Sequence, residues 1–269
     1  MRRIKKCTVF LLLLCLLLNL AGCAAAQKPL RVTLVLKTVT EVAEFWGTLL
    51  SGVEKAAEEY GVELKVLTSP REIDIDKQIE LIRQVTADKP DVMILSAADY
   101  DRCAEATEEA IAAGIGVVAI DTDVNAAGRA CFVGSNSYEI GLEMGRAMAS
   151  YLPEGGKVAV IQHMLTTTTG IERTRGVLDA LNEAGNIEIL GSFCCDNSTE
   201  QAQTITTELL SADPEIRGFV CTNEVCNVGA ANALVELGMG GRVYVVGCDN
   251  SQRQIQFLEQ NIIQAIVTQ

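Results

Sequence analysis

From residue 30 onward, short apolar runs alternate with amphipathic stretches. Runs rich in β-branched residues, such as LRVTLVL (30–36) and the run from Ile115 to Ile120, predict buried strands. Between them, apolar residues recur at helical spacing, as from Glu44 to Tyr60, where Gly61 predicts the end of the helix. The other strands of this half are expected at 62–67, 91–96 and 131–134, and the other helices at 73–87 and 100–113.

The same alternation repeats in the second half. Strict alternation of strands and helices gives parallel sheets with right-handed crossovers. Two similar runs of strands predict an α/β protein with two doubly wound parallel-sheet lobes. A closed eightfold barrel is the alternative, but the break at Gly134-Ser135-Asn136 fits it poorly. Strands are expected at 157–162, 187–193, 218–222, 242–247 and 262–267, and helices at 138–151, 171–184, 198–211, 225–237 and 252–260.

The first 22 residues predict an export signal. A basic start is followed by an apolar run, Val9 to Leu18, that is too short to span a bilayer comfortably. The run Leu20-Ala21-Gly22-Cys23 closely resembles the lipobox of bacterial lipoproteins, which implies cleavage before Cys23 and attachment of diacylglyceryl to its sulfur. Residues 23–29 would then tether the protein to a membrane surface. An ordinary secretory signal with a chance cysteine is the alternative.

The charge and the cysteine content of the chain limit which partners we expect it to bind. The 269 residues carry a formal charge of −13, which becomes −17 once residues 1–22 are removed, because they hold four basic and no acidic residues. An acidic chain argues against nucleic acid as a partner. The seven cysteines after Cys23 are odd in number and lack C-x-x-C pairs and histidine companions, so we expect no metal site and mostly small buried side chains.

The stretch from Gly114 to Val124 supplies the first candidate binding residues. Asp121 and Asp123 directly follow a predicted strand, and open α/β sheets bind ligands beyond the carboxyl ends of their strands. We therefore expect Asp121 at the mouth of a crevice. Catalysis and a cofactor are not expected, because His163 is the sole histidine, has no nucleophile motif around it, and no phosphate-binding glycine loop occurs.

Six segments in order resemble the type I periplasmic sugar-binding proteins of ABC transporters, the ribose- and galactose-binding group. They are PDVMIL, VVAIDTDV, FVGSNSYEIG, the R-x-R-G run from Arg173 to Gly176, TNEVCNVGA and VVGCDNS. The resemblance covers residues 30–269 and implies a hinge crossed near Ser135, near Asp249 and again after Gln269, so that the sequence given would be truncated. It implies an N-terminal lobe of 30–134 plus 250–269 and a C-terminal lobe of 135–249.

The resemblance also implies a sugar site between the lobes. Carboxylates, guanidinium and amides make strong hydrogen bonds to sugar hydroxyls, and aromatic rings cover apolar faces. Structural roles remain open for several positions: Trp46 also lies on the apolar face of its helix, and Asn223 is a favoured helix cap. The matching positions are Phe45, Trp46, Ser96, Asp121, Ser135, Arg173, Asn223, Asp249 and Gln269.

Three departures argue against ribose as the ligand: Ala43, Thr122 and Cys248 stand where ribose binders carry other residues. Lys37 could supply a replacement donor, although a solvated lysine is the simpler expectation. We expect an extracytoplasmic, lipid-anchored monomer at the cell surface or in the periplasm that captures a monosaccharide or related polyol and delivers it to an ABC permease. A ligand-sensing subunit for a chemoreceptor or histidine kinase is the alternative, whereas the export signal leaves no room for the DNA-binding segment of a repressor.

Overall fold

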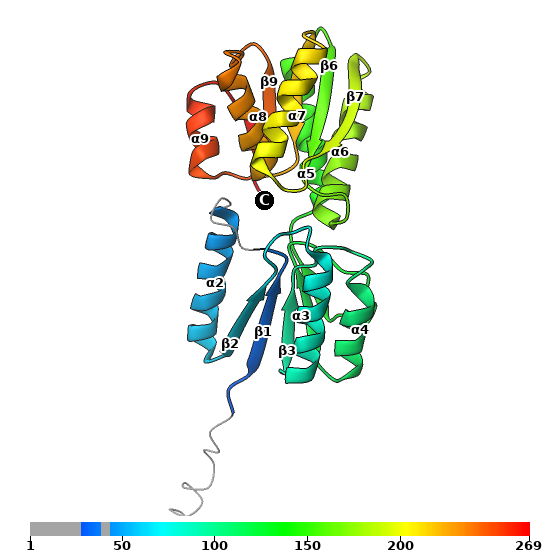
Figure 1. Ribbon diagram of the computed structural model, residues 1–269, viewed down its shortest axis with the longest axis vertical. Coiled ribbons are helices and arrows are strands. Elements are labelled where there is room, and N and C mark those ends of the chain that lie inside the picture. Colours follow the sequence, from blue (N-terminus) through cyan, green and yellow to red (C-terminus); the bar gives the residue numbers. More distant parts are fainter. Residues whose placement is uncertain (1–27, 39–43) are drawn as a thin grey trace, which may run out of the picture. The chain divides into compact units, whose positions relative to one another are not determined.

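The computed structural model describes residues 28–38 and 44–269. The predicted signal, Cys23 and Ala43 lie outside the described residues. Residues 31–269 form one compact unit that contains two five-stranded parallel sheets (Figure 1). Within the described part of the chain, no helix is both long and apolar enough to cross a membrane.

The first lobe is built on a sheet with the strand order β2-β1-β3-β4-β5, in which all neighbouring strands are parallel. This is a doubly wound order, because the sequence of strands reverses direction between β1 and β3. Its strands are β1 (Arg31–Leu36), β2 (Glu63–Thr68), β3 (Val92–Leu95), β4 (Gly116–Ile120) and β5 (Cys131–Val133), and its helices are α2 (Glu44–Tyr60), α3 (Ile75–Asp88) and α4 (Ala104–Ala112).

The second lobe has the order β10-β9-β8-β6-β7, again all parallel. Counted from its own first strand, β6, this order is the same as that of the first sheet. Its strands are β6 (Gly156–Gln162), β7 (Ile187–Cys194), β8 (Ile216–Cys221), β9 (Tyr244–Cys248) and β10 (Ala265–Val267), and its helices are α5 (Ser137–Tyr151), α6 (Thr168–Ala184), α7 (Thr199–Ala212), α8 (Glu224–Glu236) and α9 (Gln252–Glu259).

Residues 250–269 belong to the second lobe, and the prediction that they return to the first was wrong. β10 pairs in parallel with β9, and Phe257 of α9 is buried in the core of the second lobe. In the repeat, β10 therefore takes the place that β5 has in the first sheet. The chain does not cross between lobes near Asp249; among the described residues it crosses once, between β5 and α5.

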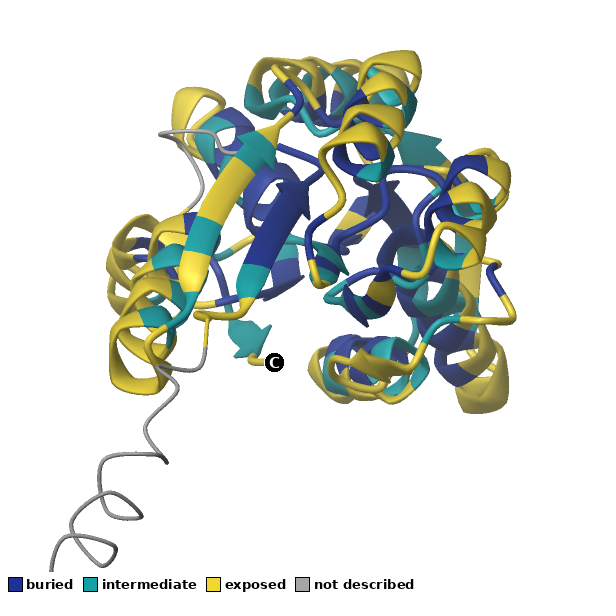
Figure 2. Cartoon of the chain, turned by 90° about the horizontal axis from the view of Figure 1, so that it is seen from below, coloured by how far each residue is buried: buried dark blue, intermediate teal, exposed yellow. Residues whose placement is uncertain are grey.

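The cores follow the two faces of each sheet, and Figure 2 shows the buried residues gathered in the strands and on the inner sides of the helices. In the second lobe, α5 and α6 cover one face around Met144 and Val177, and α7 and α8 cover the other around Phe219 and Leu234. In the first lobe, α3 and α4 cover one face. The opposite face holds only a small buried cluster with α2, of Leu34, Leu36 and Trp46.

The two lobes differ in one helix, α5 of the second lobe. α5 precedes the first strand of its sheet and packs against β9 and β10, and no described helix takes this position in the first lobe. Strand β5 is correspondingly open: the exposed fractions of Phe132 and Val133 are 37% and 59%.

The pairing of α5 with α6 depends on two glycines. A Cβ atom on Gly141 would lie 2.2 Å from the carbonyl oxygen of Arg173, and one on Gly176 would lie 2.2 Å from that of Tyr138. Any side chain at either position would therefore push the helices apart. Because α6 is held this close to α5, the position of Arg173 on α6 is fixed within the second lobe.

All seven described cysteines are free thiols. Five are buried and pack as small apolar side chains, in line with the expectation from the sequence. The exceptions are Cys131, which is exposed on β5 of the first lobe, and Cys194, which is partly exposed at the end of β7 in the second.

Candidate functional site

A cavity lies at the carboxyl ends of the strands of both sheets. Its volume is about 400 Å³, counting all space free of protein atoms and including its open side. The first lobe contributes Lys37, Phe45, Trp46, Glu72 and Asp121, and the second contributes His163, Thr169, Arg173, Asn197, Asn223, Glu224, Val225, Asp249 and Gln269.

Asp121 and Asp249 occupy equivalent places in the two lobes: each is the first residue after its strand, β4 or β9. Both have left-handed backbone conformations, with φ of 59° and 76°. Both backbone N–H groups donate to the neighbouring edge strand, to the carbonyls of Val133 and Val267, at 3.0 Å each. This conformation is costly for a side-chain-bearing residue, although aspartate tolerates it better than most. The same strained turn thus sets one carboxylate of each lobe on the cavity wall.

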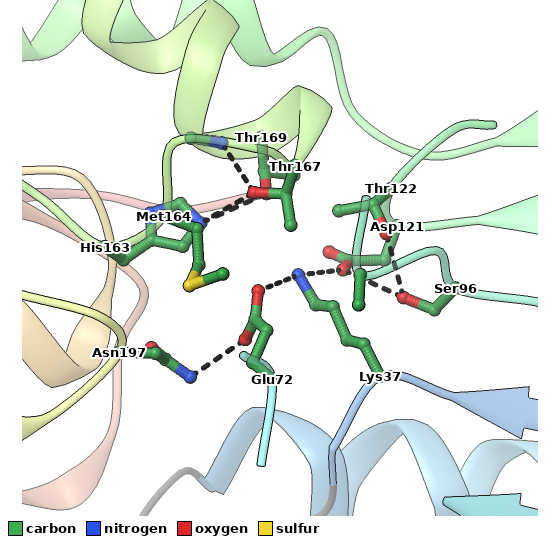
Figure 3. A network of polar contacts seen from close by, with 12 residues as sticks. Lys37, Glu72, Ser96, Asp121, Thr122, His163, Met164, Thr167, Thr169 and Asn197 are labelled. Atoms are coloured by element: carbon green, nitrogen blue, oxygen red, sulfur yellow. Dashed lines mark hydrogen bonds and ion pairs between the residues drawn. The ribbon is translucent and has the colours of Figure 1, made fainter. Parts of the chain in front are cut away.

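Lys37, directly after β1, is buried, so the expectation of a solvated lysine was wrong. Its Nζ lies 2.9 Å from Glu72 Oε1 and 3.3 Å from Asp121 Oδ2 (Figure 3). Burial by itself lowers the pKa of Lys37, but the two carboxylates outweigh it and the pKa is raised. Lys37 therefore stays charged and holds both carboxylates in place. The ammonium also lies 5.6 Å from the centre of the Trp46 ring.

Two of the predicted site residues do not line this cavity. Ser96 is fully buried behind Asp121, where its hydroxyl lies 3.4 Å from Asp121 Oδ2 and 3.1 Å from Thr122 Oγ1 (Figure 3). It can position the carboxylate but cannot touch a ligand. Ser135 is exposed and borders a separate hollow with Phe132 and Tyr138, because the crossing segment runs outside the strand ends that form the cavity.

In the second lobe, a chain of hydrogen bonds joins Arg173 to Asp249. Arg173 is buried and donates from Nη1 to the carbonyl of Thr222 and from Nη2 to Gln269 Oε1, both at 2.9 Å. Gln269 Nε2 in turn donates to Asp249 Oδ1 at 2.7 Å, and Asp249 Oδ2 accepts from the backbone N–H of Glu224 at 2.9 Å. Arg173 Nε is buried and has no hydrogen-bond partner among the described residues.

His163 ends β6 and lies in the cavity wall as a neutral group. Its Nδ1 is 2.7 Å from Thr222 Oγ1, and its Nε2 is 3.2 Å from Thr169 Oγ1 (Figure 3 shows the ring beside Thr169). Burial, and then the charges of Lys37 and Arg173, hold the pKa of His163 well below its usual value. An uncharged ring with both nitrogens in use has a structural role.

Sequence reasoning missed Glu72 and Asn197. They follow β2 and β7, and their side chains meet across the cavity, Asn197 Nδ2 donating to Glu72 Oε2 at 2.8 Å (Figure 3). The rule that singled out Asp121, a polar residue after a strand, applies equally to both. Each lies four residues or fewer past its strand, in a loop whose path the sequence pattern does not define.

The chemistry of the wall is that of hydrogen bonding. Carboxylates accept, Arg173 donates, and the amides of Asn197, Asn223 and Gln269 do both. Among the described residues, no group of three or more His, Cys, Asp or Glu side chains is arranged to hold a metal ion. Fold and site together define a two-lobed binding protein for a small polar ligand.

Residues 33–269 match the family model described as a periplasmic binding protein domain, and the chain belongs to that family. It is similar to the D-ribose/D-allose-binding protein of Pseudomonas aeruginosa, with 27% identity over 234 residues that cover 84% of this chain and 72% of the relative. It is also similar to the D-allose-binding periplasmic protein of Escherichia coli, with 26% identity over 262 residues, 94% and 82% of the two chains. The crystal structure of a sugar transporter from Clostridium phytofermentans superposes with a TM-score of 0.81 and 28% identity, covering 88% of this chain and 86% of that one.

These comparisons confirm the predicted resemblance to type I periplasmic sugar-binding proteins and the two-lobed parallel α/β fold. The family consists of substrate-binding proteins of transporters and not of enzymes, as the sequence motifs indicated.

Proposed function

We propose that the protein is an extracytoplasmic solute-binding lipoprotein that captures a neutral monosaccharide or related polyol in this cavity and delivers it to an ABC permease. The observation that carries the proposal is the pair of equivalent carboxylates, Asp121 and Asp249. Each is joined to a buried cation, the first directly to Lys37 and the second through Gln269 to Arg173. The named ligands of the two relatives, D-ribose and D-allose, support a sugar.

The proposed binding mode follows from the geometry of the donors and acceptors. A carboxylate can accept from two neighbouring sugar hydroxyls at once, and these charge-assisted bonds are strong. Arg173 lines the same cavity, and each of its terminal nitrogens has a second N–H that can donate to the ring of hydroxyls. Phe45 and Trp46 cover an apolar face of the sugar. Phe45, Trp46, Asp121, Arg173, Asn223, Asp249 and Gln269 are the proposed ligand contacts.

The charge of the cavity favours a neutral ligand over a phosphorylated or carboxylated one. Lys37 is already paired with two carboxylates, and both terminal nitrogens of Arg173 already donate. An anionic ligand would meet an excess of negative charge, because the carboxylates of the cavity outnumber its cations. The acidic residues are Glu72, Asp121, Glu224 and Asp249, against the two cations.

The test is a calorimetric and thermal-shift panel on protein starting at residue 24. A sugar at one hundred times its dissociation constant adds about 2.7 kcal/mol to the free energy of unfolding. We expect one or more neutral pentoses, hexoses or polyols to raise the melting temperature, and sugar phosphates and uronates to leave it unchanged. Asp121→Asn and Asp249→Asn abolish the shift, whereas Glu58→Gln, an exposed charge change on α2, keeps it. A panel in which no neutral sugar binds contradicts the proposal.

The proposed lipid anchor rests on the run from Leu20 to Cys23. Cells that express the full chain should incorporate labelled palmitate into the protein, and Cys23→Ala should abolish the label and release the protein from membranes. Retention of the label in that variant would contradict the anchor.

A further inference from the structure

The aromatic hydrocarbon rings of the cavity wall come from one lobe. Among the described residues that line the cavity, the phenyl and indole rings belong to Phe45 and Trp46, both on α2. They meet edge to face, with centroids 5.0 Å apart and an interplanar angle of 81°. The described lining of the second lobe has no Phe, Tyr or Trp; its one ring is the hydrogen-bonded imidazole of His163. A sugar can therefore rest a C–H face on the rings of α2, while the second lobe offers mostly polar groups and Val225.

The loop that carries Asn197 is held rigidly. Asp196 and Asn197 both have left-handed backbones, with φ of 49° and 54°. The backbone N–H of Cys195 donates to the carbonyl of Gln162 at 3.0 Å, and that of Asn197 donates to the carbonyl of His163 at 2.8 Å. Asparagine tolerates this conformation, and bulky residues do so poorly. The loop is thus fixed to the end of β6 with an amide, and not an aromatic ring, facing the cavity.

The Asn197 side chain connects the polar walls of the two lobes. Its Nδ2 donates to Glu72 Oε2, and its Oδ1 accepts from Asn223 Nδ2, both at 2.8 Å. Glu72 is itself paired with Lys37. Among the described residues, the bond from Asn197 to Glu72 is the only hydrogen bond between side chains of different lobes. A continuous polar strip therefore runs from Lys37 to Asn223.

We propose that Asn197 and Glu72 bind a hydroxyl that projects from one face of the sugar ring, so that the site selects pyranoses with an axial hydroxyl at C2, C3 or C4. This inference rests on the proposed function and names its substrate class. In β-D-glucopyranose and β-D-xylopyranose all ring hydroxyls are equatorial, and both faces of the ring are apolar. If such a sugar bound, one apolar face would contact the amide of Asn197 and the carboxylate of Glu72. Both groups would lose water without gaining a hydrogen bond from the sugar, and this desolvation lowers the affinity.

The test compares sugars that differ at one carbon. D-Glucose is measured against its single epimers D-mannose, D-allose and D-galactose, and D-xylose against its C3 epimer D-ribose, all by calorimetry on protein starting at residue 24. We expect at least one epimer with an axial hydroxyl at C2, C3 or C4 to bind ten or more times as tightly as glucose or xylose, which have none at these carbons. Equal affinities within both sets overturn this inference and leave the proposed function intact. If no sugar binds at all, the proposed function itself fails.

Substitution of Asn197 separates recognition from folding. Asn197→Gly keeps the left-handed backbone accessible, because glycine adopts positive φ without strain. We expect the preference for the axial epimer to fall to less than threefold, while the affinity for every sugar falls together because the bond to Glu72 between the lobes is lost. Asn261→Gly is the matched control, since Asn261 has φ of 58° and lies away from the cavity lining. An undiminished preference in Asn197→Gly overturns the role of Asn197.

Discussion

Glu224 is a buried carboxyl group whose charge changes near neutral pH. It is 4% exposed, its Oε2 has no hydrogen-bond partner among the described residues, and Asp249 and Glu44 lie near it. Burial, with a smaller contribution from Asp249, raises the pKa of Glu224 from its usual 4.5 to about 7, although a hydrogen bond from Ser251 acts in the opposite direction. The folded protein therefore holds this proton more tightly than the unfolded chain does.

A pH dependence of stability follows. Between pH 4.5 and pH 7 the folded state binds more protons than the unfolded state, so the free energy of unfolding falls as the pH rises. Above pH 7 Glu224 is charged in both states, and its burial then lowers the free energy of unfolding by at most about 3 kcal/mol. We expect Glu224→Gln to be more stable than the parent at pH 8 and equally stable at pH 4, as measured by urea unfolding. Parallel pH profiles of the two proteins would refute this.

Lys37 and Lys65 each pair with carboxylates, but Lys37 is buried and Lys65 is exposed, so the two can be compared. Lys37→Met leaves Glu72 and Asp121 buried without their cation, which costs about 3 to 5 kcal/mol. Lys65→Met breaks an exposed pair with Asp88, made at 2.6 Å, and costs less than about 1 kcal/mol. Urea unfolding measures both. Equal losses would mean that the buried cation is not what holds the two carboxylates.

At the scale of elements, the contact between α5 and α6 sets the position of Arg173. In Gly176→Ala, the new Cβ would meet backbone atoms of α5, the Tyr138 carbonyl oxygen at 2.2 Å and the Leu142 nitrogen at 2.7 Å, which cannot rotate away. We expect a loss of about 1 to 3 kcal/mol or more and weaker ligand binding. Gly47→Ala on α2, where nothing lies within 4 Å, should instead gain about 0.5 to 1 kcal/mol. A stable Gly176→Ala with unchanged affinity would show that the helices can shift freely.

The sequence predicted the elements well, because hydrophobic periodicity reports local structure. It did not predict which sheet residues 250–269 join, since periodicity defines a strand without defining its neighbours. Asp121 could be found because it directly follows a buried strand. Lys37 could not be recognised as buried, because its partner Glu72 comes from a loop 35 positions away in the chain. The prediction for Ser135 was wrong: it borders a separate hollow, although Gln269, at the matching place beyond the other edge strand β10, lines the cavity.

At the scale of the whole molecule, the two lobes meet through a few polar contacts. Besides the bond from Asn197 to Glu72, the backbone N–H of Asp123 donates to Thr168 Oγ1 at 3.0 Å, and that of Gln252 donates to Glu44 Oε2 at 3.1 Å. Thr166 adds two more bonds: its hydroxyl donates to the Ala98 carbonyl at 2.9 Å, and its carbonyl accepts from the Tyr100 N–H at 3.0 Å. Each such bond contributes about 0.5 to 1.5 kcal/mol, so the lobes can separate at modest cost.

Weakening one of these contacts outside the cavity should lower ligand affinity. Thr168→Val removes the acceptor for Asp123 without touching the cavity lining, and the closed state becomes less populated. Apparent affinity falls in proportion to that population, so we expect a loss of about twofold to tenfold. Thr204→Val, which removes only a bond within α7, should leave the dissociation constant unchanged. Calorimetry distinguishes the two, and equal affinities would assign Thr168 no part in closure.

The placement of the cysteines gives each lobe one natural attachment point for a fluorophore. In protein starting at residue 24, Cys131 is exposed in the first lobe, Cys194 is partly exposed in the second, and the other five are buried. Burial raises the pKa of the Cys194 thiol to about 11, so a maleimide at neutral pH should react first with Cys131. A donor dye can thus be placed on one lobe and an acceptor on the other in two successive labelling steps. Energy transfer between them would follow the opening and closing of single molecules without an engineered residue.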